Sequence, residues 1–154
     1  MNTYSALGIE KNNSEDSQKI VYKSGDESRT STTIADDNDL TLTLEKNSVY
    51  AIEAFLFVIG GTFKLTFAGT ATATNMDIRA RVHETQFNSI GFVRFTSLGG
   101  TGTNSSIGTG NNIFTCTGSI EVNAGGTFIL KWASNDGTAG VLKRGSWMSF
   151  RRIK

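Results

Sequence analysis

Residues 40–67 read LTLTLEKNSVYAIEAFLFVIGGTFKLTF and carry the pattern that decides the fold. Leucine alternates with threonine over residues 40–44, and apolar and polar residues alternate again over residues 63–67. Side chains of a β-strand point alternately to its two faces, so each run predicts a strand with one buried face. Residues 49–59 are apolar on both faces, which is typical of a central strand in a sandwich.

The same period of two continues through the rest of the chain. Further strands are predicted at residues 76–82, 90–95, 113–122, 127–132 and 147–153. Short runs rich in glycine, asparagine and aspartate separate them and predict turns. No segment has the pattern of a helix longer than two turns. We therefore expect an all-β, antiparallel sandwich of about eight strands, with residues 1–18 as an extended polar arm and residues 19–154 as one domain.

Composition limits the classes of function. The chain has 154 residues, of which 38% are hydrophobic, so it can bury a core of its own. Its 15 basic and 14 acidic residues are spread along the chain, which argues against nucleic-acid or membrane partners. Cys116 is the only cysteine, so an intrachain disulfide is excluded. Residues 1–10 lack the basic and apolar regions of a secretory signal, which predicts synthesis in a reducing cytoplasm.

Residue types that carry catalysis are sparse. His83 is the only histidine and alternates with charged residues, which predicts a polar residue on the outer face of a strand. Cys116 lies in an alternating run and is expected to be a small buried side chain. Glu53 is the one acid in an apolar strand, and we expect it to be paired, with Arg152 as a hypothetical partner. These patterns predict no catalytic residue, no cofactor and no metal site, and hence a protein that is not an enzyme.

Two polar segments leave alternatives open. Residues 36–39 read DDND and predict a turn before the next strand, with a structural cation as the alternative. The glycine-rich run at 99–104 lacks the lysine and the following helix of a phosphate loop, so it predicts a flexible surface loop. Such a loop is a candidate for contacting a ligand. The whole candidate loop spans residues 99–112, and its candidate contact residues are Gly100, Thr103, Asn104 and Asn111.

The end of the chain carries a family resemblance. The runs GSIEV at 118–122, GGTFILKWASN at 125–135 and LKRGSWMSFRRI at 142–153 resemble a domain common among structural proteins of tailed bacteriophages. The run KSGDES at 23–28 is similar to the opening of that domain. The resemblance covers roughly residues 19–153, although the proline-containing loop usual after the strand ending at Phe67 is missing.

The resemblance implies an antiparallel jelly roll similar to the tumour-necrosis-factor fold, assembled as a trimer with the last strand facing the symmetry axis. Met148 and Phe150 would then lie in the core. The other face of that strand would form a subunit interface, with Trp147, Ser149 and Arg151 as its residues. Alternatively, Trp147 lies at the rim of its own core.

The same resemblance implies a non-enzymatic virion structural protein made in the host bacterial cytoplasm and located on the virion surface. We expect a trimeric capsid decoration or head-fibre protein whose partners are its own copies and the major capsid protein or another virion protein. It would attach through arm residues Met1, Asn2, Thr3, Tyr4, Leu7 and Ile9. The alternative is a receptor- or carbohydrate-binding head of a tail fibre or baseplate protein.

Overall fold

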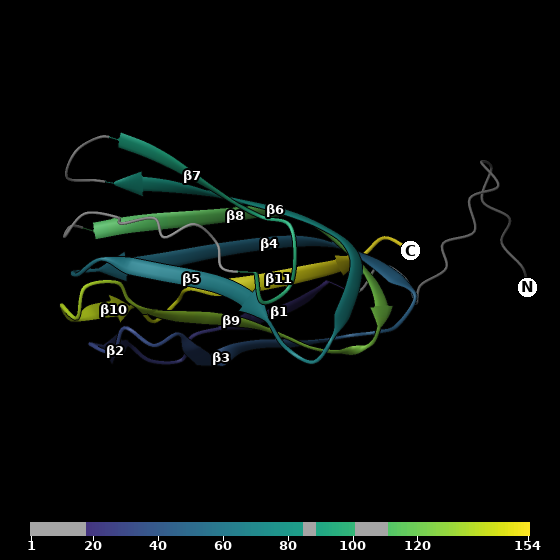
Figure 1. Cartoon of the computed structure of the whole chain (residues 1–154), viewed down its shortest axis with the longest axis horizontal. Helices are drawn as coiled ribbons and strands as arrows, with labels where there is room; N and C mark the ends of the chain where they lie inside the picture. Colours follow the sequence, from purple (N-terminus) through teal and green to yellow (C-terminus); the bar gives the residue numbers. More distant parts are fainter. Residues whose placement is uncertain (1–17, 85–88, 101–110) are drawn as a thin grey trace, which may run out of the picture.

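The computed structural model describes residues 18–84, 89–100 and 111–154. All regular secondary structure in these ranges is strand, and the strands form two antiparallel sheets that face each other (Figure 1). The expected all-β antiparallel sandwich is therefore confirmed. No helix of the described ranges meets the length and apolarity needed to cross a membrane.

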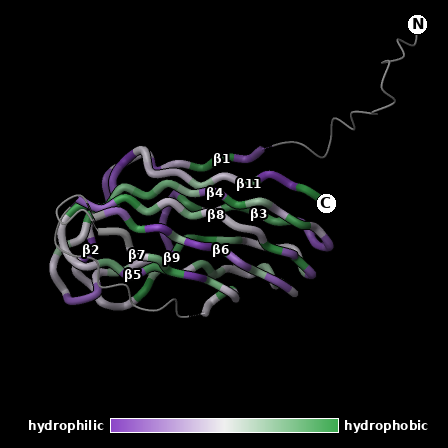
Figure 2. Tube along the Cα trace, turned by 90° about the horizontal axis from the view of Figure 1, so that it is seen from above, coloured by the Kyte–Doolittle hydropathy of each residue, from purple (hydrophilic) through white to green (hydrophobic). Residues whose placement is uncertain are grey.

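The larger sheet runs in the order β1, β11, β4, β8, β6, β7 (Figure 2). Two short strands join it, since β10 pairs with both β4 and β2. The smaller sheet has the order β3, β9, β5. The bounds in the larger sheet are β1 Lys19–Tyr22, β2 Glu27–Arg29, β4 Ser48–Ile59, β6 Thr72–Glu84, β7 Ser89–Phe95, β8 Asn111–Ala124, β10 Gly140–Leu142 and β11 Trp147–Arg152. Those in the smaller sheet are β3 Ala35–Leu44, β5 Phe63–Ala68 and β9 Gly126–Ser134.

Each of the eight predicted segments is a strand in the structure. The largest differences are in β6 and β3, which extend beyond the alternating runs that predicted them. Three strands of only three or four residues, β1, β2 and β10, were not predicted. A segment this short cannot show a period, so only its partner strand defines it.

Aromatic rings fill the space between the sheets. Phe63 of β5 stacks on Trp132 of β9 with ring centroids 4.7 Å apart. Phe128 of β9 meets Phe150 of β11 edge-on at 5.2 Å, which joins the smaller sheet to the larger. Trp132 and Phe128 are fully buried, and each such ring contributes roughly 1.5–3 kcal/mol to folding through the apolar area it removes from water. The apolar side chains of the alternating runs thus pack into one continuous core.

Gly118 lets two central strands approach closely. It lies on β8 opposite Ile78 of β6. A Cβ atom at this position would lie 2.0 Å from the backbone oxygen of Asp77, inside van der Waals contact. Glycine is therefore required here by the separation of the strands.

Candidate protein-binding face

The last strand divides its side chains between the core and the outer face of the larger sheet. Met148 and Phe150 are 0% and 2% exposed and lie in the core, as expected. Trp147, Ser149 and Arg151 alternate with them and therefore belong to the outer face. The predicted division of β11 between two faces is confirmed, whereas a role in subunit contact stays a prediction.

Three aromatic side chains lie abreast on this outer face. Tyr22 of β1 is opposite Trp147 of β11, and Trp147 is opposite Phe55 of β4. Residues opposite each other in antiparallel strands share a face and contact one another. Tyr22 is 66% exposed, and Trp147 and Phe55 are half-buried. We call Tyr22, Trp147 and Phe55 the aromatic row.

The next row of outward-facing residues along these three strands has smaller and more polar side chains. Ser149 lies between Ile20 of β1 and Glu53 of β4. Ser149 is only 2% exposed, and its hydroxyl accepts a hydrogen bond from Nε2 of Gln18 at 3.2 Å. Ile20 itself is 57% exposed. Ser149 therefore lies under side chains of its own chain, and Ile20 and Glu53 form the exposed surface of this row.

A shallow hollow lies beside the aromatic row at the edge of the sheet. It has a volume of about 390 Å³ and is lined by Gln18, Ile20, Tyr22, Gly145 and Trp147. Most of this lining is apolar, with Tyr22 and Trp147 supplying two rings. The hollow could receive an apolar side chain or the flat face of a sugar.

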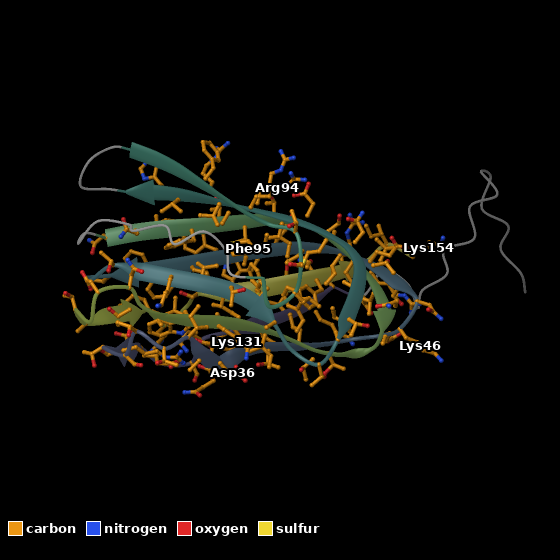
Figure 3. All side chains as sticks on the ribbon, viewed as in Figure 1. Asp36, Lys46, Arg94, Phe95, Lys131 and Lys154 are labelled. Atoms are coloured by element: carbon orange, nitrogen blue, oxygen red, sulfur yellow. The ribbon has the colours of Figure 1, made fainter. Side chains whose placement is uncertain are left out.

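The opposite end of the same face is basic. Arg79 and Arg81 of β6 and Arg94 of β7 are all exposed on it, and Figure 3 shows Arg94 pointing away from the core. Asp77 is bound by Arg94 at 2.9 Å and lies 3.6 Å from Arg79. The hydrogen bond from Arg94 lowers the pKa of Asp77, which favours the charged form of this carboxylate.

An aromatic ring is exposed at this basic end. The guanidinium group of Arg81 lies 5.6 Å from the centroid of the Phe92 ring, within the range of a cation–π contact. Phe92 is 72% exposed. We call Arg79, Arg81, Arg94 and Phe92 the basic end, and together with the aromatic row it gives the face two chemically different halves.

The expected pair between Glu53 and Arg152 is wrong. Nη1 of Arg152 lies 2.8 Å from Glu45 instead, at the end of the sandwich. Arg152 is opposite Tyr50, whereas Glu53 is opposite Ser149, so the two side chains belong to opposite faces of the sheet. Glu53 is exposed in the middle of the outer face.

The histidine and cysteine lie where the alternation placed them. His83 is exposed on the outer face, opposite Ile113 of β8. Cys116 is fully buried, and burial raises the pKa of its thiol to about 12. The thiol is therefore protonated at neutral pH and is a small core side chain, as expected.

The acidic run at 36–39 is divided among separate partners. Asp36 pairs with Lys131 of β9 at 2.7 Å, on the outer side of the smaller sheet (Figure 3). Asp39 accepts a hydrogen bond from the backbone N–H of Ser24 at 3.1 Å. Among the described residues, no three acidic, histidine or cysteine side chains gather in the way a metal ion needs. The segment is part of β3, whose register shifts between Asp36 and Thr41.

Asp37 is the buried member of this run. Its Oδ2 accepts from Nζ of Lys23 at 2.8 Å and from Nε1 of Trp132 at 3.0 Å. Burial raises the pKa of Asp37, but the bonds from Lys23 and two backbone N–H groups outweigh it and lower the pKa. Burial likewise lowers the pKa of Lys23, and its bonds to Asp37 and Glu27 reverse this and raise it. Both groups are therefore charged in the folded protein.

The remaining candidate residues are only partly described. Gly100 lies at the end of a described range, and its carbonyl accepts a hydrogen bond from the Thr66 hydroxyl at 2.7 Å. Asn111 is exposed at the start of β8. The other predicted contact and arm residues lie outside the described residues, namely Thr103, Asn104, Met1, Asn2, Thr3, Tyr4, Leu7 and Ile9.

Several residues of the outer face were missed from the sequence. Ile20 and Tyr22 lie in a strand too short to recognise, and Phe92 lies in a run that is apolar on both faces. Lys23 is not on this face, but its burial was also missed, because it stands in a polar segment of the sequence. A hydrophobic pair spaced by two, as at Ile20 and Tyr22, was the only local sign of a shared face.

Comparison with known proteins adds no relative. No protein-family model matches the sequence, and a search of curated proteins finds no significant match.

Proposed function

We propose that the chain is a non-enzymatic virion structural protein of a tailed bacteriophage, a capsid decoration or head-fibre protein that forms homotrimers through the outer face of the larger sheet. One observation carries the self-association. Large apolar side chains stand exposed on this face, namely Ile20 at 57%, Tyr22 at 66% and Phe92 at 72%.

Exposed rings of this size favour a protein partner. Covering a Tyr, Trp or Phe side chain removes a large apolar area from water, and aromatic residues dominate the energy of many interfaces. The aromatic row places Tyr22, Trp147 and Phe55 on three adjacent strands, so a partner can cover all three at once. Paired strands hold these side chains on an ordered backbone, so binding orders little additional main chain.

The two halves of the face suit a head-to-tail contact between copies. Glu53 stands exposed next to the aromatic row, and the basic end carries three arginines beside Phe92. In our proposal the aromatic row and Glu53 of one copy meet the basic end of the next. A contact between two different surfaces is heterologous, and it closes into a trimeric ring when each copy is rotated by a third of a turn relative to the last.

The resemblance to phage structural domains supplies the rest of the proposal. It supports a jelly roll similar to the tumour-necrosis-factor fold and a location on the virion surface. Arm residues 1–18 precede β1, the edge strand that carries Ile20 and Tyr22. The arm would attach the trimer to the major capsid protein or another virion protein, with synthesis in the host bacterial cytoplasm.

Substitution in the aromatic row tests the self-association. Trp147→Ala combined with Tyr22→Ser should convert the trimer to monomers at micromolar concentration, because truncating a central aromatic residue of an interface costs about 2 kcal/mol or more. Multi-angle light scattering across a dilution series gives the mass. The matched control is Ile129→Thr on the half-buried outer side of β9, which should leave the trimer intact. A wild-type protein that is monomeric at every concentration refutes the proposal.

The alternative function is a receptor- or carbohydrate-binding head. The observation that favours it is the hollow of about 390 Å³ between Tyr22 and Trp147, where a sugar ring could stack. Pull-downs on intact host cells and on purified empty capsids separate the two functions. Binding to cells but not to capsids, lost with Tyr22→Ser, supports the alternative. Binding to capsids alone supports the decoration protein.

A further inference from the structure

We propose that Lys23 and Asp37 condense to an intramolecular isopeptide bond, with Glu27 as the catalytic residue. The proposal concerns the link between the two sheets and does not depend on the proposed function. It rests on the side chains of Lys23, which follows β1, Glu27 of β2 and Asp37 of β3, which meet one another.

The reacting groups are already in contact. Nζ of Lys23 lies 2.8 Å from Oδ2 of Asp37 and 2.6 Å from Oε2 of Glu27. The side chains of Lys23 and Asp37 are 1% and 0% exposed, and that of Glu27 is 17% exposed. A primary amine, a carboxyl group and a second carboxylate thus share one water-excluded site.

This placement changes the balance between amide formation and hydrolysis. In water, two such groups meet rarely and the solvent favours hydrolysis. Groups held in contact by a fold react with effective concentrations of about 10⁵–10⁸ M. Because both side chains are buried, bulk water has little access to the amide once it has formed, which disfavours its hydrolysis.

The step balances without any co-reactant. Glu27 takes one proton from the Lys23 ammonium and relays it to Oδ2 of Asp37, which gives a neutral amine and a neutral acid. The Nζ lone pair then attacks Cγ of Asp37 and forms the C–N bond. Glu27 moves a second proton from Nζ to Oδ2, the C–Oδ2 bond breaks, and one water leaves. One proton remains on the amide nitrogen.

The surroundings suit the charge that develops during attack. Oδ1 of Asp37 accepts from the backbone N–H groups of Asp39 at 3.0 Å and Leu40 at 2.9 Å. These two donors would stabilise the oxyanion of the tetrahedral intermediate and then the amide carbonyl. Nε1 of Trp132 donates to Oδ2, the oxygen that leaves. Product and intermediate both find hydrogen-bond partners that the fold already supplies.

Glu27 is fixed in position by a neighbouring arginine. Nε of Arg29 donates to Oε1 of Glu27 at 2.7 Å, and Nη2 donates to the same oxygen. The Arg29 guanidinium lies 4.2 Å from the centre of the Trp132 rings and bonds the Trp132 carbonyl. The other carboxylate oxygen, Oε2, is thereby aimed at Lys23. Arg29 is a positioning residue, since it acts through Glu27.

The product removes a buried pair of charges. As an ion pair, Lys23 and Asp37 must both remain desolvated, which is costly inside a protein. The amide is neutral, its carbonyl keeps the bonds from the N–H groups of Asp39 and Leu40, and its one N–H can donate to Glu27, while Nε1 of Trp132 loses Oδ2 as its acceptor. It would also join the end of β1, an edge strand of the larger sheet, to β3, an edge strand of the smaller one. The bond would close a covalent loop from residue 23 to residue 37.

Intact-mass spectrometry of the denatured full-length protein tests the proposal. Wild-type protein, purified and incubated at neutral pH, should be lighter than its sequence by the mass of one water. Fragmentation should then yield a branched peptide that joins Lys23 to Asp37. Wild-type protein that keeps its full sequence mass overturns the proposal, and so does a branched peptide that joins any other pair.

Variants identify the role of each group. Lys23→Arg keeps the charge but cannot form the amide, so it should have its full sequence mass. Asp37→Asn should release ammonia in place of water. Glu27→Gln should fold, as judged by circular dichroism, and form the bond at least tenfold more slowly, because the proton relay is gone. An unchanged rate in Glu27→Gln overturns the catalytic role.

Asp39 is the matched control. Its carboxylate lies 3.9 Å from the same Nζ but is partly exposed and hydrogen-bonded to Ser24. Asp39→Asn should therefore form the Lys23–Asp37 bond at the wild-type rate. Loss of the bond in this variant would show that Asp39 is the reacting partner and overturn the assignment to Asp37.

Discussion

At the scale of single residues, one step along a strand decides whether a side chain meets the core or a partner. Met148 is fully buried while Trp147, one position away, lies in the aromatic row. The same rule explains why Glu53 does not reach Arg152, since the register puts them on opposite faces. Residue type and hydropathy do not show to which face Arg152 belongs, because an arginine at the end of a strand can lie beside either face.

The buried cysteine gives a prediction at this scale. Native protein at about pH 8 should not react with a thiol reagent such as DTNB, because a pKa of about 12 leaves almost no thiolate and the sulfur is fully buried. Absorbance of the released thiolate measures the reaction. The same sample in denaturing urea should release one equivalent per chain. Rapid reaction of the folded protein would show that β8 opens to solvent.

At the scale of the elements, alternation predicted the long strands, and pairing defined the short ones. Residues 40–44 and 63–67 alternate strictly, and both became strands with their apolar side chains buried. β1 is a strand because four of its residues pair with β11, which no local pattern reveals. Its partner strand, β11, lies at the far end of the sequence.

Gly118 provides a test at the same scale. Gly118→Ala places a Cβ against the Asp77 backbone oxygen, which cannot rotate away, so β8 and β6 must separate. We expect a loss of about 1–3 kcal/mol in the free energy of unfolding. Urea denaturation followed by circular dichroism measures it.

Gly91→Ala is the control for that variant. Gly91 lies in β7, where a new Cβ would meet only Val82 at 3.8 Å, an ordinary contact. Its free energy of unfolding should stay within about 0.5 kcal/mol of the wild type. An equal loss of unfolding free energy in the two variants would indicate a general cost of replacing glycine in a strand. It would exclude the close approach of β8 to β6 as the cause.

At the scale of the whole molecule, the two sheets differ in what they expose. The outer face of the larger sheet carries the aromatic row and the basic end, whereas β3 and β9 of the smaller sheet expose the Asp36–Lys131 pair and threonines. An interface on one side leaves the other side in solvent. In the proposed trimer the larger sheets face one another, and the smaller sheets form the exterior.

The arm gives the prediction for the assembled particle. Deletion of residues 1–17 should leave a folded trimer, because the arm precedes β1 and the core formed by the described residues lies after it. The truncated trimer should fail to decorate capsids that the full chain decorates. Co-sedimentation with purified capsids measures binding, and light scattering confirms the trimer. Decoration by the truncated form would assign attachment to the sandwich itself.

The sequence alone determined the strand class, the eight long strands and, for the strands whose apolar and polar residues alternate, their division between core and surface. These follow from a period of two, which is a local property that the peptide geometry imposes. Only the tertiary structure decided that Tyr22 lies beside Trp147 and that Lys23 lies buried against Asp37. Both contacts join segments whose meeting depends on sheet order and register, and the packing of the entire core sets these at once.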